Sequence, residues 1–187
     1  MKKGSLFSMS IKHRLRRHLI EVRLALPLSR RKEAKEKVLA DLLPRLEKFS
    51  LILSFASKEE EINLWPLNKE LAKEKRLLLP RVENESLIPL KVEDFESDLQ
   101  ETTFLKVKEP LPQKCQLIPL DQIDCVLVPG LGFDKQRHRI GYGLGHFDRF
   151  LSKLSCPFLG IGFKEQLVNE SLPVEEHDVS LTEVFLF

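Results

Sequence analysis

Apolar and polar residues follow each other with helical spacing in the first part of the chain. Around the segment from Ser10 to Ala25, apolar residues recur every three or four positions and share one face, with basic residues opposite: Ile11, Leu15, Leu19, Val22 and Leu26. Pro27 stops this helix, and Ser29 is a favourable cap for a second helix that runs to about Leu43. The pattern therefore predicts two helices at the start of the chain.

Later segments contain continuous apolar runs that end abruptly at turn residues, which is typical of buried strands. The predicted strands cover residues 51–55, 76–79, 87–92, 125–128 and 158–162, with a last edge strand at 183–187. Helical patterns between them predict helices over residues 64–75 and 146–154. Residues 94–119 are polar and contain several prolines, and the pattern assigns no element to them.

The order of these elements indicates the fold class. Strands that alternate with helices predict an α/β protein, with a single-domain, three-layer αβα fold whose mainly parallel sheet has helices on both faces. A length of 187 residues fits one domain over residues 1–187. Met1 to Ser8 show no periodic pattern, so Met9 is an alternative start, and we expect disorder over residues 1–9. In such sheets ligands bind beyond the carboxyl ends of the strands.

Charge is distributed unevenly, although the net charge is only +2. Residues 2–37 contain twelve Lys and Arg against three Asp and Glu, so this segment carries +9 and the remainder −7. Such polarity suits an anionic ligand near the N-terminus, although a basic run is more often a solvated helix face. The small net charge and the lack of aromatic residues among the bases at 12–37 disfavour a nucleic-acid-binding module.

The three cysteines indicate a reducing environment. Cys115, Cys125 and Cys156 are widely spaced and odd in number, which predicts reduced thiols. No apolar run reaches the length of a membrane span, and the N-terminal segment lacks a signal-peptide core. We therefore expect a cytoplasmic monomer with no membrane and no nucleic-acid partner.

Five of the eight glycines lie between Gly130 and Gly145. The cluster follows the predicted strand at 125–128 and precedes a helix, an order in which backbone N–H groups approach an anion closely. Taken alone, glycine at alternate positions favours an ordinary surface turn, and the run matches neither a Walker A loop nor the dinucleotide fingerprint. Arg139 before the glycines and Asp148 after them favour a phosphate site, because they supply a cation for phosphate oxygens and a carboxylate suited to Mg²⁺.

The residues around this cluster resemble those of the 5-formyltetrahydrofolate cyclo-ligase family, also called 5,10-methenyltetrahydrofolate synthetases. Members of that family carry P-G-L-A/G-F-D, a short turn, and then R-L-G-x-G-x-G-Y-Y-D. These motifs correspond here to Pro129–Asp134 and Arg139–Asp148. The resemblance covers most of the chain and extends to four further segments: Lys12-x-x-x-Arg16, Glu60-Glu61-Ile62, Phe163–Gln166 and Pro173–Asp178.

This resemblance implies an ATP-dependent ring closure of 5-formyltetrahydrofolate to 5,10-methenyltetrahydrofolate, with release of ADP and phosphate. Phosphorylation of the formyl oxygen would give an iminium phosphate, which nitrogen 10 of the folate then attacks. ATP is the implied co-substrate and Mg²⁺ the implied cofactor. Because phosphoryl transfer requires mainly alignment and charge neutralisation, the parts needed from the protein are cations and backbone donors.

Carried over position by position, the resemblance also implies a role for individual residues. Lys12 and Arg139 would be catalytic, and Glu61 would contact the pterin ring of the folate. Asp148 and Asp178 would be Mg²⁺ ligands. The residues expected to bind ATP are Lys12, Arg16, Arg139, Ile140, Gly141, Tyr142, Gly143, Leu144, Gly145, His146 and Phe147.

Departures from the family pattern leave a second function open. The family commonly has lysine where this chain has Leu144, and a Tyr-Tyr pair where it has His146 and Phe147. Loss of the lysine removes a charge-assisted contact with phosphate. The alternative is therefore a folate- or nucleotide-binding protein of the same fold with reduced or lost turnover.

Other interpretations of single residues also stay open. The family commonly has glycine where this chain has Arg137, and Lys135, Arg137 and His138 are candidate replacements for the missing lysine charge. Glu61 has a structural alternative as a charge near the start of a helix, and Asp148 as a surface carboxylate.

Overall fold

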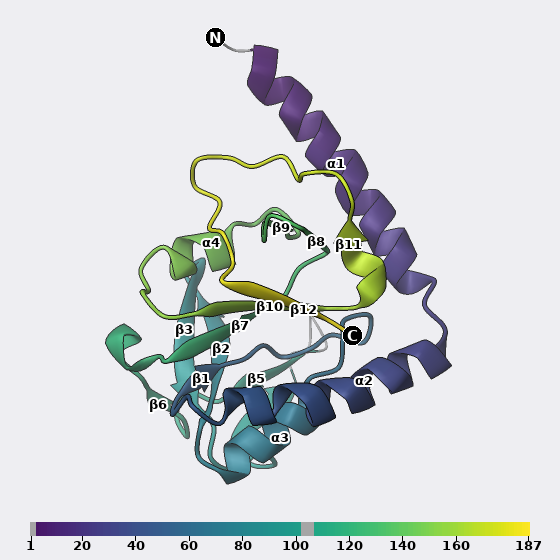
Figure 1. The fold of residues 1–187 in the computed structure, drawn as a ribbon. Coiled ribbons are helices and arrows are strands. Elements are labelled where there is room, and N and C mark those ends of the chain that lie inside the picture. Colours follow the sequence, from purple (N-terminus) through teal and green to yellow (C-terminus); the bar gives the residue numbers. More distant parts are fainter. Residues whose placement is uncertain (1–2, 102–106) are drawn as a thin grey trace.

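The computed structural model of the chain describes residues 3–101 and 107–187. At its centre is a seven-stranded sheet with the strand order β12-β10-β7-β1-β2-β3-β6 (Figure 1). The strands from β12 to β2 are parallel, and β3 and β6 extend the β2 edge in antiparallel pairs. Their bounds are β1 (Ile52–Leu53), β2 (Leu77–Glu83), β3 (Ser86–Lys91), β6 (Gln116–Leu117), β7 (Cys125–Val128), β10 (Phe158–Gly162) and β12 (Glu183–Leu186).

Helices α2 (Leu28–Leu42) and α3 (Trp65–Lys73) cover one face of this sheet (Figure 1). They pack on alternate positions of the central strands: Ile52, Leu77, Leu79, Cys125, Leu127, Leu159 and Ile161. Val38 and Leu42 of α2 and Leu67 and Leu71 of α3 are almost fully buried there. Because each buried aliphatic side chain contributes about 1.5–3 kcal/mol, this face holds a large share of the core energy.

The opposite face is covered by the short helix α4 (His146–Leu151) and by the chain that precedes β12. A second sheet lies beside it with the order β11-β8-β9, in which β8 is Gly132–Asp134, β9 is Arg139–Ile140 and β11 is Leu167–Val168. Helix α1 (Lys3–Leu24) packs on this smaller sheet through Leu19, which contacts a cluster with Leu131, Ile140 and Leu172.

The remaining elements are short. Strands β4 (Leu99–Glu101) and β5 (Lys108–Pro110) form an antiparallel pair. The described residues also form three single-turn 3₁₀ helices: η1 (Pro44–Leu46), η2 (Leu120–Gln122) and η3 (Lys164–Gln166).

The fold class predicted from the sequence is confirmed, since a mainly parallel sheet has helices on both faces. The four predicted helices correspond to α1–α4, and α1 includes residues 3–9, where the sequence shows no pattern. The prediction that Ser29 caps α2 is wrong, because the cap position is Pro27 and no side chain bonds the first turn. A proline φ of −67° already suits the start of a helix, so Leu28 begins it directly.

The predicted strands at 76–79 and 87–92 are the two strands of one hairpin, β2 and β3, whose turn residues Asn84 and Glu85 have φ values of 47° and 63°.

Several other strands were not predicted from the sequence. Strands β8, β9 and β11, and those within 94–119, contain only two or three residues each. Such segments are too short to show a two-residue period, and residues 102–106 lie outside the described part of the chain.

All three cysteines are free thiols. Burial raises the pKa of Cys125 to about 12, so this thiol is protonated and a poor nucleophile. Within the described ranges, no helix combines the length and the apolar content required to cross a membrane.

Phe133 of β8 joins the small sheet to the large one. Its buried ring lies against three glycines, of which Gly160 and Gly162 belong to β10 and Gly130 precedes β8. A Cβ atom at these glycines would stand only 2.7–2.8 Å from the ring. The glycines therefore make room for an aromatic side chain that fixes the separation of the two sheets.

We expect Gly160→Ala to destabilise the protein by about 1–3 kcal/mol, the usual cost of overpacking a core. The new methyl group would meet Leu181 Cδ1 at 2.6 Å as well as the Phe133 ring. Urea denaturation measures the loss. Gly141→Ala is the control, because a Cβ there has no neighbour within 4 Å. Equal midpoints for the two variants would show that the ring does not constrain the sheets.

Candidate functional site

The glycine cluster forms a hairpin followed by a loop. After β7 the chain makes the β8–β9 hairpin, and residues 141–145, the glycine loop, then lead to α4. The buried carboxylate of Asp134 closes the hairpin turn by accepting the N–H of His138 at 2.8 Å. Gly143 and Gly145 have φ values of +100° and +67°, which residues with side chains rarely adopt. The loop therefore requires glycine at two of its positions.

A cavity of about 440 Å³ lies beside the glycine loop, a volume typical of a small-molecule site. Its walls come from α1, the segment between β1 and α3, the β2–β3 hairpin, the glycine loop and the chain before β12. Every residue that the sequence assigns to the site belongs to this lining. Further lining residues are Phe55, Ala56, Lys58, Pro80, Val82, Leu87, Val107, Glu109, Pro129, Gly130, Glu175 and His177.

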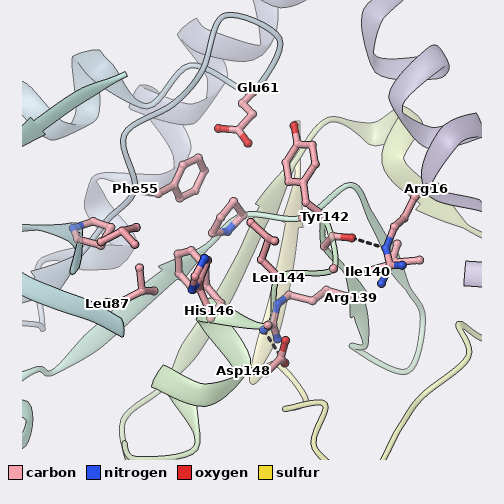
Figure 2. Close-up of a pocket in the computed structure, with 18 of the residues that line it drawn as sticks. Arg16, Phe55, Glu61, Leu87, Arg139, Ile140, Tyr142, Leu144, His146 and Asp148 are labelled. Atoms are coloured by element: carbon pink, nitrogen blue, oxygen red, sulfur yellow. Dashed lines mark hydrogen bonds and ion pairs between the residues drawn. The ribbon is translucent and has the colours of Figure 1, made fainter. Parts of the chain in front are cut away.

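One end of the cavity brings three cations together. The Nε atom of Arg16 donates to the carbonyl oxygen of Gly141 at 2.9 Å, and its guanidinium lies against Gly143 (Figure 2). Lys12 lies one helical turn earlier on α1, and Arg139 is the first residue of β9. Positive charge from two distant parts of the chain thus surrounds the glycine loop.

Two of these cations are paired with the carboxylates that the sequence assigns to a metal. Lys12 Nζ lies 2.9 Å from Asp178 Oδ2, and Arg139 Nη2 donates to Asp148 Oδ1 at 2.7 Å (Figure 2). The side chains of Lys12 and Arg139 are only 9% and 5% exposed, so solvent screens these pairs weakly. Burial raises the pKa of Asp178, but hydrogen bonds from Lys12 and the Glu175 N–H lower it by more, so Asp178 is ionised.

The chain before β12 supplies a compact group of metal-ligand atoms. Glu175, His177 and Asp178 each place one such atom within 4.8 Å of the others. Lys12 Nζ also lies 3.4 Å from Glu175 Oε1, so its ammonium group is the positive charge that faces both Glu175 and Asp178. In the part of the chain that the structure describes, Asp148 belongs to no such group.

The other end of the cavity is mainly apolar and contains one buried carboxylate. Glu61 lies there near Phe55, across the cavity from the pair of Arg139 and Asp148 (Figure 2). Burial raises the pKa of Glu61, and the Lys58 N–H, which donates to Oε2 at 3.0 Å, opposes the rise only in part. The cavity therefore has a cationic end and, opposite it, a mainly apolar end where the carboxylate of Glu61 is buried.

Comparison with known protein families shows which family has this sequence. A sequence profile of the 5-formyltetrahydrofolate cyclo-ligase family matches residues 8–186. The chain belongs to this family.

Relatives named 5-formyltetrahydrofolate cyclo-ligase align with parts of the chain. The mouse protein is 38% identical over 68 residues, 33% of each chain. The Escherichia coli protein is 36% identical over 83 residues, 43% of this chain and 45% of the relative. The protein from Mycolicibacterium smegmatis is 28% identical over 114 residues, 58% of each chain. The chain thus aligns with less than two thirds of the length of these relatives.

Solved structures extend the likeness to nearly the whole chain. The NMR structure of Aquifex aeolicus 5,10-methenyltetrahydrofolate synthetase superimposes with a TM-score of 0.82 at 28% identity, over 93% of this chain and 88% of that one. A synthetase from Mycoplasma pneumoniae shares the fold, with a TM-score of 0.74 at 23% identity over 92% and 96%. The chain therefore shares the fold of these synthetases over most of its length.

One departure from the family pattern removes a positive charge from the cavity wall. Leu144, in place of the common lysine, is 69% exposed at the cavity wall. Lys135, Arg137 and His138, the candidates to replace the lysine charge, are absent from the described lining. Arg137 donates to the Thr182 carbonyl at 3.2 Å, and His138 Nδ1 lies 3.0 Å from Asp134 Oδ2. A substitute for the lysine charge is therefore not provided by this turn.

The family's Tyr-Tyr pair is replaced by residues with a structural contact. His146 Nδ1 lies 2.9 Å from the carbonyl oxygen of Glu85, to which Arg149 Nη2 also donates at 3.2 Å. These contacts tie the start of α4 to the β2–β3 hairpin.

Some lining residues were not singled out from the sequence. Glu175 and His177 lie within the segment Pro173–Asp178 that carries the resemblance, so the segment was found but not their grouping. Lys58 lines the cavity and places its Nζ 4.7 Å from the centre of the Tyr142 ring, a contact that no local pattern signals.

We expect Asp148→Asn to lower the free energy of unfolding by about 1–3 kcal/mol, because the buried guanidinium of Arg139 would lose its anionic partner. Chemical denaturation without ligands measures this loss. Asp41→Asn, at an exposed position of α2, is the matched control and should leave stability nearly unchanged. A loss no larger than that of the control would show that the pair contributes nothing.

Proposed function

We propose that this protein is a 5-formyltetrahydrofolate cyclo-ligase that uses ATP to form 5,10-methenyltetrahydrofolate. One observation carries the proposal: a single cavity joins a glycine loop surrounded by three cations to an apolar end with a buried carboxylate. A triphosphate and a pterin ring require these two environments. Membership of the family and the likeness to the Aquifex synthetase support the same function.

The cationic end would hold the phosphates of ATP. Arg16 and Arg139 offer planar guanidinium groups, Lys12 offers an ammonium, and the glycine loop brings backbone N–H groups close. Each charge-assisted contact contributes about 1.5–3 kcal/mol. These groups would align the γ-phosphate with the formyl oxygen at the centre of the cavity.

The apolar end would hold the pterin ring. Phe55 and Leu87 present apolar surface, and the carboxylate of Glu61 is placed to accept N–H donors of the ring. A buried acceptor binds a matching donor strongly, because water does not compete for it. Ring orientation would therefore be set by Glu61.

The reaction itself requires activation of an amide. The formyl oxygen would attack the γ-phosphorus and ADP would leave, which gives an iminium phosphate. Nitrogen 10 would then attack the formyl carbon, and phosphate would depart with the former formyl oxygen as nitrogen 10 loses its proton. The cations stabilise negative charge on the phosphoryl oxygens during both steps, and alignment supplies much of the remaining rate.

The carboxylates fit a Mg²⁺ ion. Asp178 and Glu175 offer hard oxygen ligands within one compact group, and Asp148 uses only Oδ1 in its contacts with described residues. These residues would hold the ion beside the phosphates. When bound, Mg²⁺ neutralises phosphate charge.

The test is direct. Purified protein is mixed with 5-formyltetrahydrofolate, and formation of 5,10-methenyltetrahydrofolate is followed by its absorbance with and without ATP. Product that forms only with ATP supports the proposal. Folate and ATP binding without product would favour the alternative, a binding protein of the same fold.

We expect Arg139→Ala to raise the apparent KM for ATP by about ten- to a hundred-fold, the range for one charge-assisted contact, with little change in folate affinity. Steady-state kinetics with each substrate varied in turn separate the two effects. Arg137→Ala is the control, because this nearby guanidinium bonds the Thr182 carbonyl outside the cavity. Unchanged ATP use in the Arg139 variant would remove it from the phosphate site.

A substitution at Leu144 tests the alternative function, a binding protein of the same fold with reduced or lost turnover. Because no charge from the neighbouring turn replaces the family's lysine, we expect Leu144→Lys to increase turnover at saturating substrates. The gain should be about ten-fold, the lower end of the range for one charge-assisted contact, because position 144 is exposed. Leu144→Gln, which adds length and polarity without charge, is the matched control. No gain over the control would show that the site works without that charge.

A further inference from the structure

Arg23, in the last turn of α1, carries a buried positive charge beside the cavity. Its side chain is only 1% exposed, and it is absent from the described lining. Its guanidinium lies behind Glu61 and Tyr142, both of which do line the cavity. Burial of a charge is costly unless partners compensate it, so its contacts indicate its role.

Those contacts join three parts of the chain. Arg23 Nη2 donates to the hydroxyl of Tyr142 and lies 3.4 Å from Glu60 Oε1. The Tyr142 hydroxyl in turn donates to the same Glu60 oxygen at 3.1 Å. Burial raises the pKa of Tyr142 to about 12, so this hydroxyl keeps its proton. Arg23 thereby links α1 to the glycine loop and to the segment that carries Glu61.

The contact with Glu61 differs from an ordinary hydrogen-bonded pair. Arg23 Nη1 lies 3.8 Å from Glu61 Oε1, which is near enough for charge compensation but beyond hydrogen-bond distance. The other oxygen, Oε2, accepts the Lys58 N–H. Among the described residues, no hydrogen bond to Oε1 is present, so this oxygen can accept one from a ligand.

Opposing effects act on the pKa of Glu61. Its side chain is 10% exposed, and burial raises its pKa, whereas the Lys58 N–H and the charges of Arg23 and Lys58 lower it. Glu60 acts in the opposite direction as a second negative charge. The titratable groups that face Glu61 are thus Arg23 from α1, Lys58 and Glu60 from its own segment, and Tyr142 from the glycine loop.

We propose that Arg23 is a positioning residue for the folate: from behind the cavity wall its charge favours the ionised form of Glu61 and its hydrogen bond fixes Tyr142, so that Glu61 accepts the N–H donors of the pterin. This inference rests on the proposed function. Arg23 itself does not touch the substrate, and its effect reaches the ligand through Glu61.

The decisive comparison is Arg23→Met against Arg14→Met, which changes an exposed arginine of the same helix. Calorimetry measures binding of 5-formyltetrahydrofolate without ATP, and of ATP without folate. We expect the Arg23 variant to bind the folate at least about ten-fold more weakly, since a buried charge loses its compensation. The loss of ATP affinity should be clearly smaller, because Arg23 reaches the glycine loop only through the hydroxyl of Tyr142. The Arg14 variant should match wild type for both ligands.

The pH dependence of folate binding gives a readout that a merely structural role would not move. Loss of Arg23 raises the pKa of Glu61 further, so the carboxylate is protonated, and folate binding lost, at a higher pH than in wild type. We expect the midpoint of this loss to rise by about one unit or more, the usual effect of removing an opposite charge at this distance. Arg23→Lys, which keeps the charge, should restore most of the wild-type midpoint.

Further variants separate the possible outcomes. In a Glu61→Gln background, Arg23→Gln should weaken folate binding little more, because the carboxylate charge that Arg23 compensates is no longer present. Arg23→Gln alone serves as the second neutral variant if the methionine variant lacks a cooperative melting transition. Loss of the fold in both neutral variants, or an unchanged folate affinity and midpoint in either, would overturn the inference. Absence of folate binding by wild type would instead overturn the proposed function together with the inference.

Discussion

The contact between Phe133 and three backbone glycines is the constraint on which the site depends. The ring can lie so close to β10 only because Gly160 and Gly162 have no side chains. The small sheet is then held at a fixed distance from the large one, and Gln166 completes the junction by donating to the carbonyl oxygens of Gly130 and Leu131 at 2.7 and 3.0 Å. Arg139 lies in the β8–β9 hairpin and the glycine loop follows it directly, so their position is set by the packing of Phe133 rather than by the loop itself.

A second feature is the internal pairing of charges at the cationic end. Lys12 and Arg139 are each paired with a carboxylate, so the protein supplies its own counter-charges for these two cations. Under the proposed function, arriving phosphates would take over the cations, and the released carboxylates would be free for a divalent ion. The two events favour each other, since either one alone leaves unbalanced charge in a weakly screened site. This mutual dependence suits an enzyme that handles a metal-nucleotide complex.

The sequence was most informative where one short segment carried several signals. The apolar run at 125–128, the glycines after it and the flanking Arg139 and Asp148 predicted a strand, a loop and a helix in the right order. The residues assigned to the site all line one cavity, and their roles stay predictions. Resemblance, rather than periodicity, supplied the distant members such as Lys12 and Asp178.

What the sequence did not predict depends on contacts between distant residues. The strands of the β8–β9 hairpin are too short for any period, and they form because Asp134 and Phe133 find partners elsewhere. Arg23 looks like one more base on the solvated side of α1, and only the fold buries it. The grouping of Glu175 with Lys12 likewise appears only when both ends of the chain meet. Local patterns cannot report such pairings, because they contain no distance information.

The ion pair of Lys12 and Asp178 joins residues 166 positions apart. Closing so long a stretch of chain costs conformational entropy, and contacts between residues far apart in the sequence are associated with slow folding. Because a chain is synthesised from its N-terminus, Lys12 is made 166 residues before Asp178, and this ion pair cannot exist until both residues are present. The cationic end of the cavity therefore reaches its final charge arrangement only when two distant segments of the chain have met.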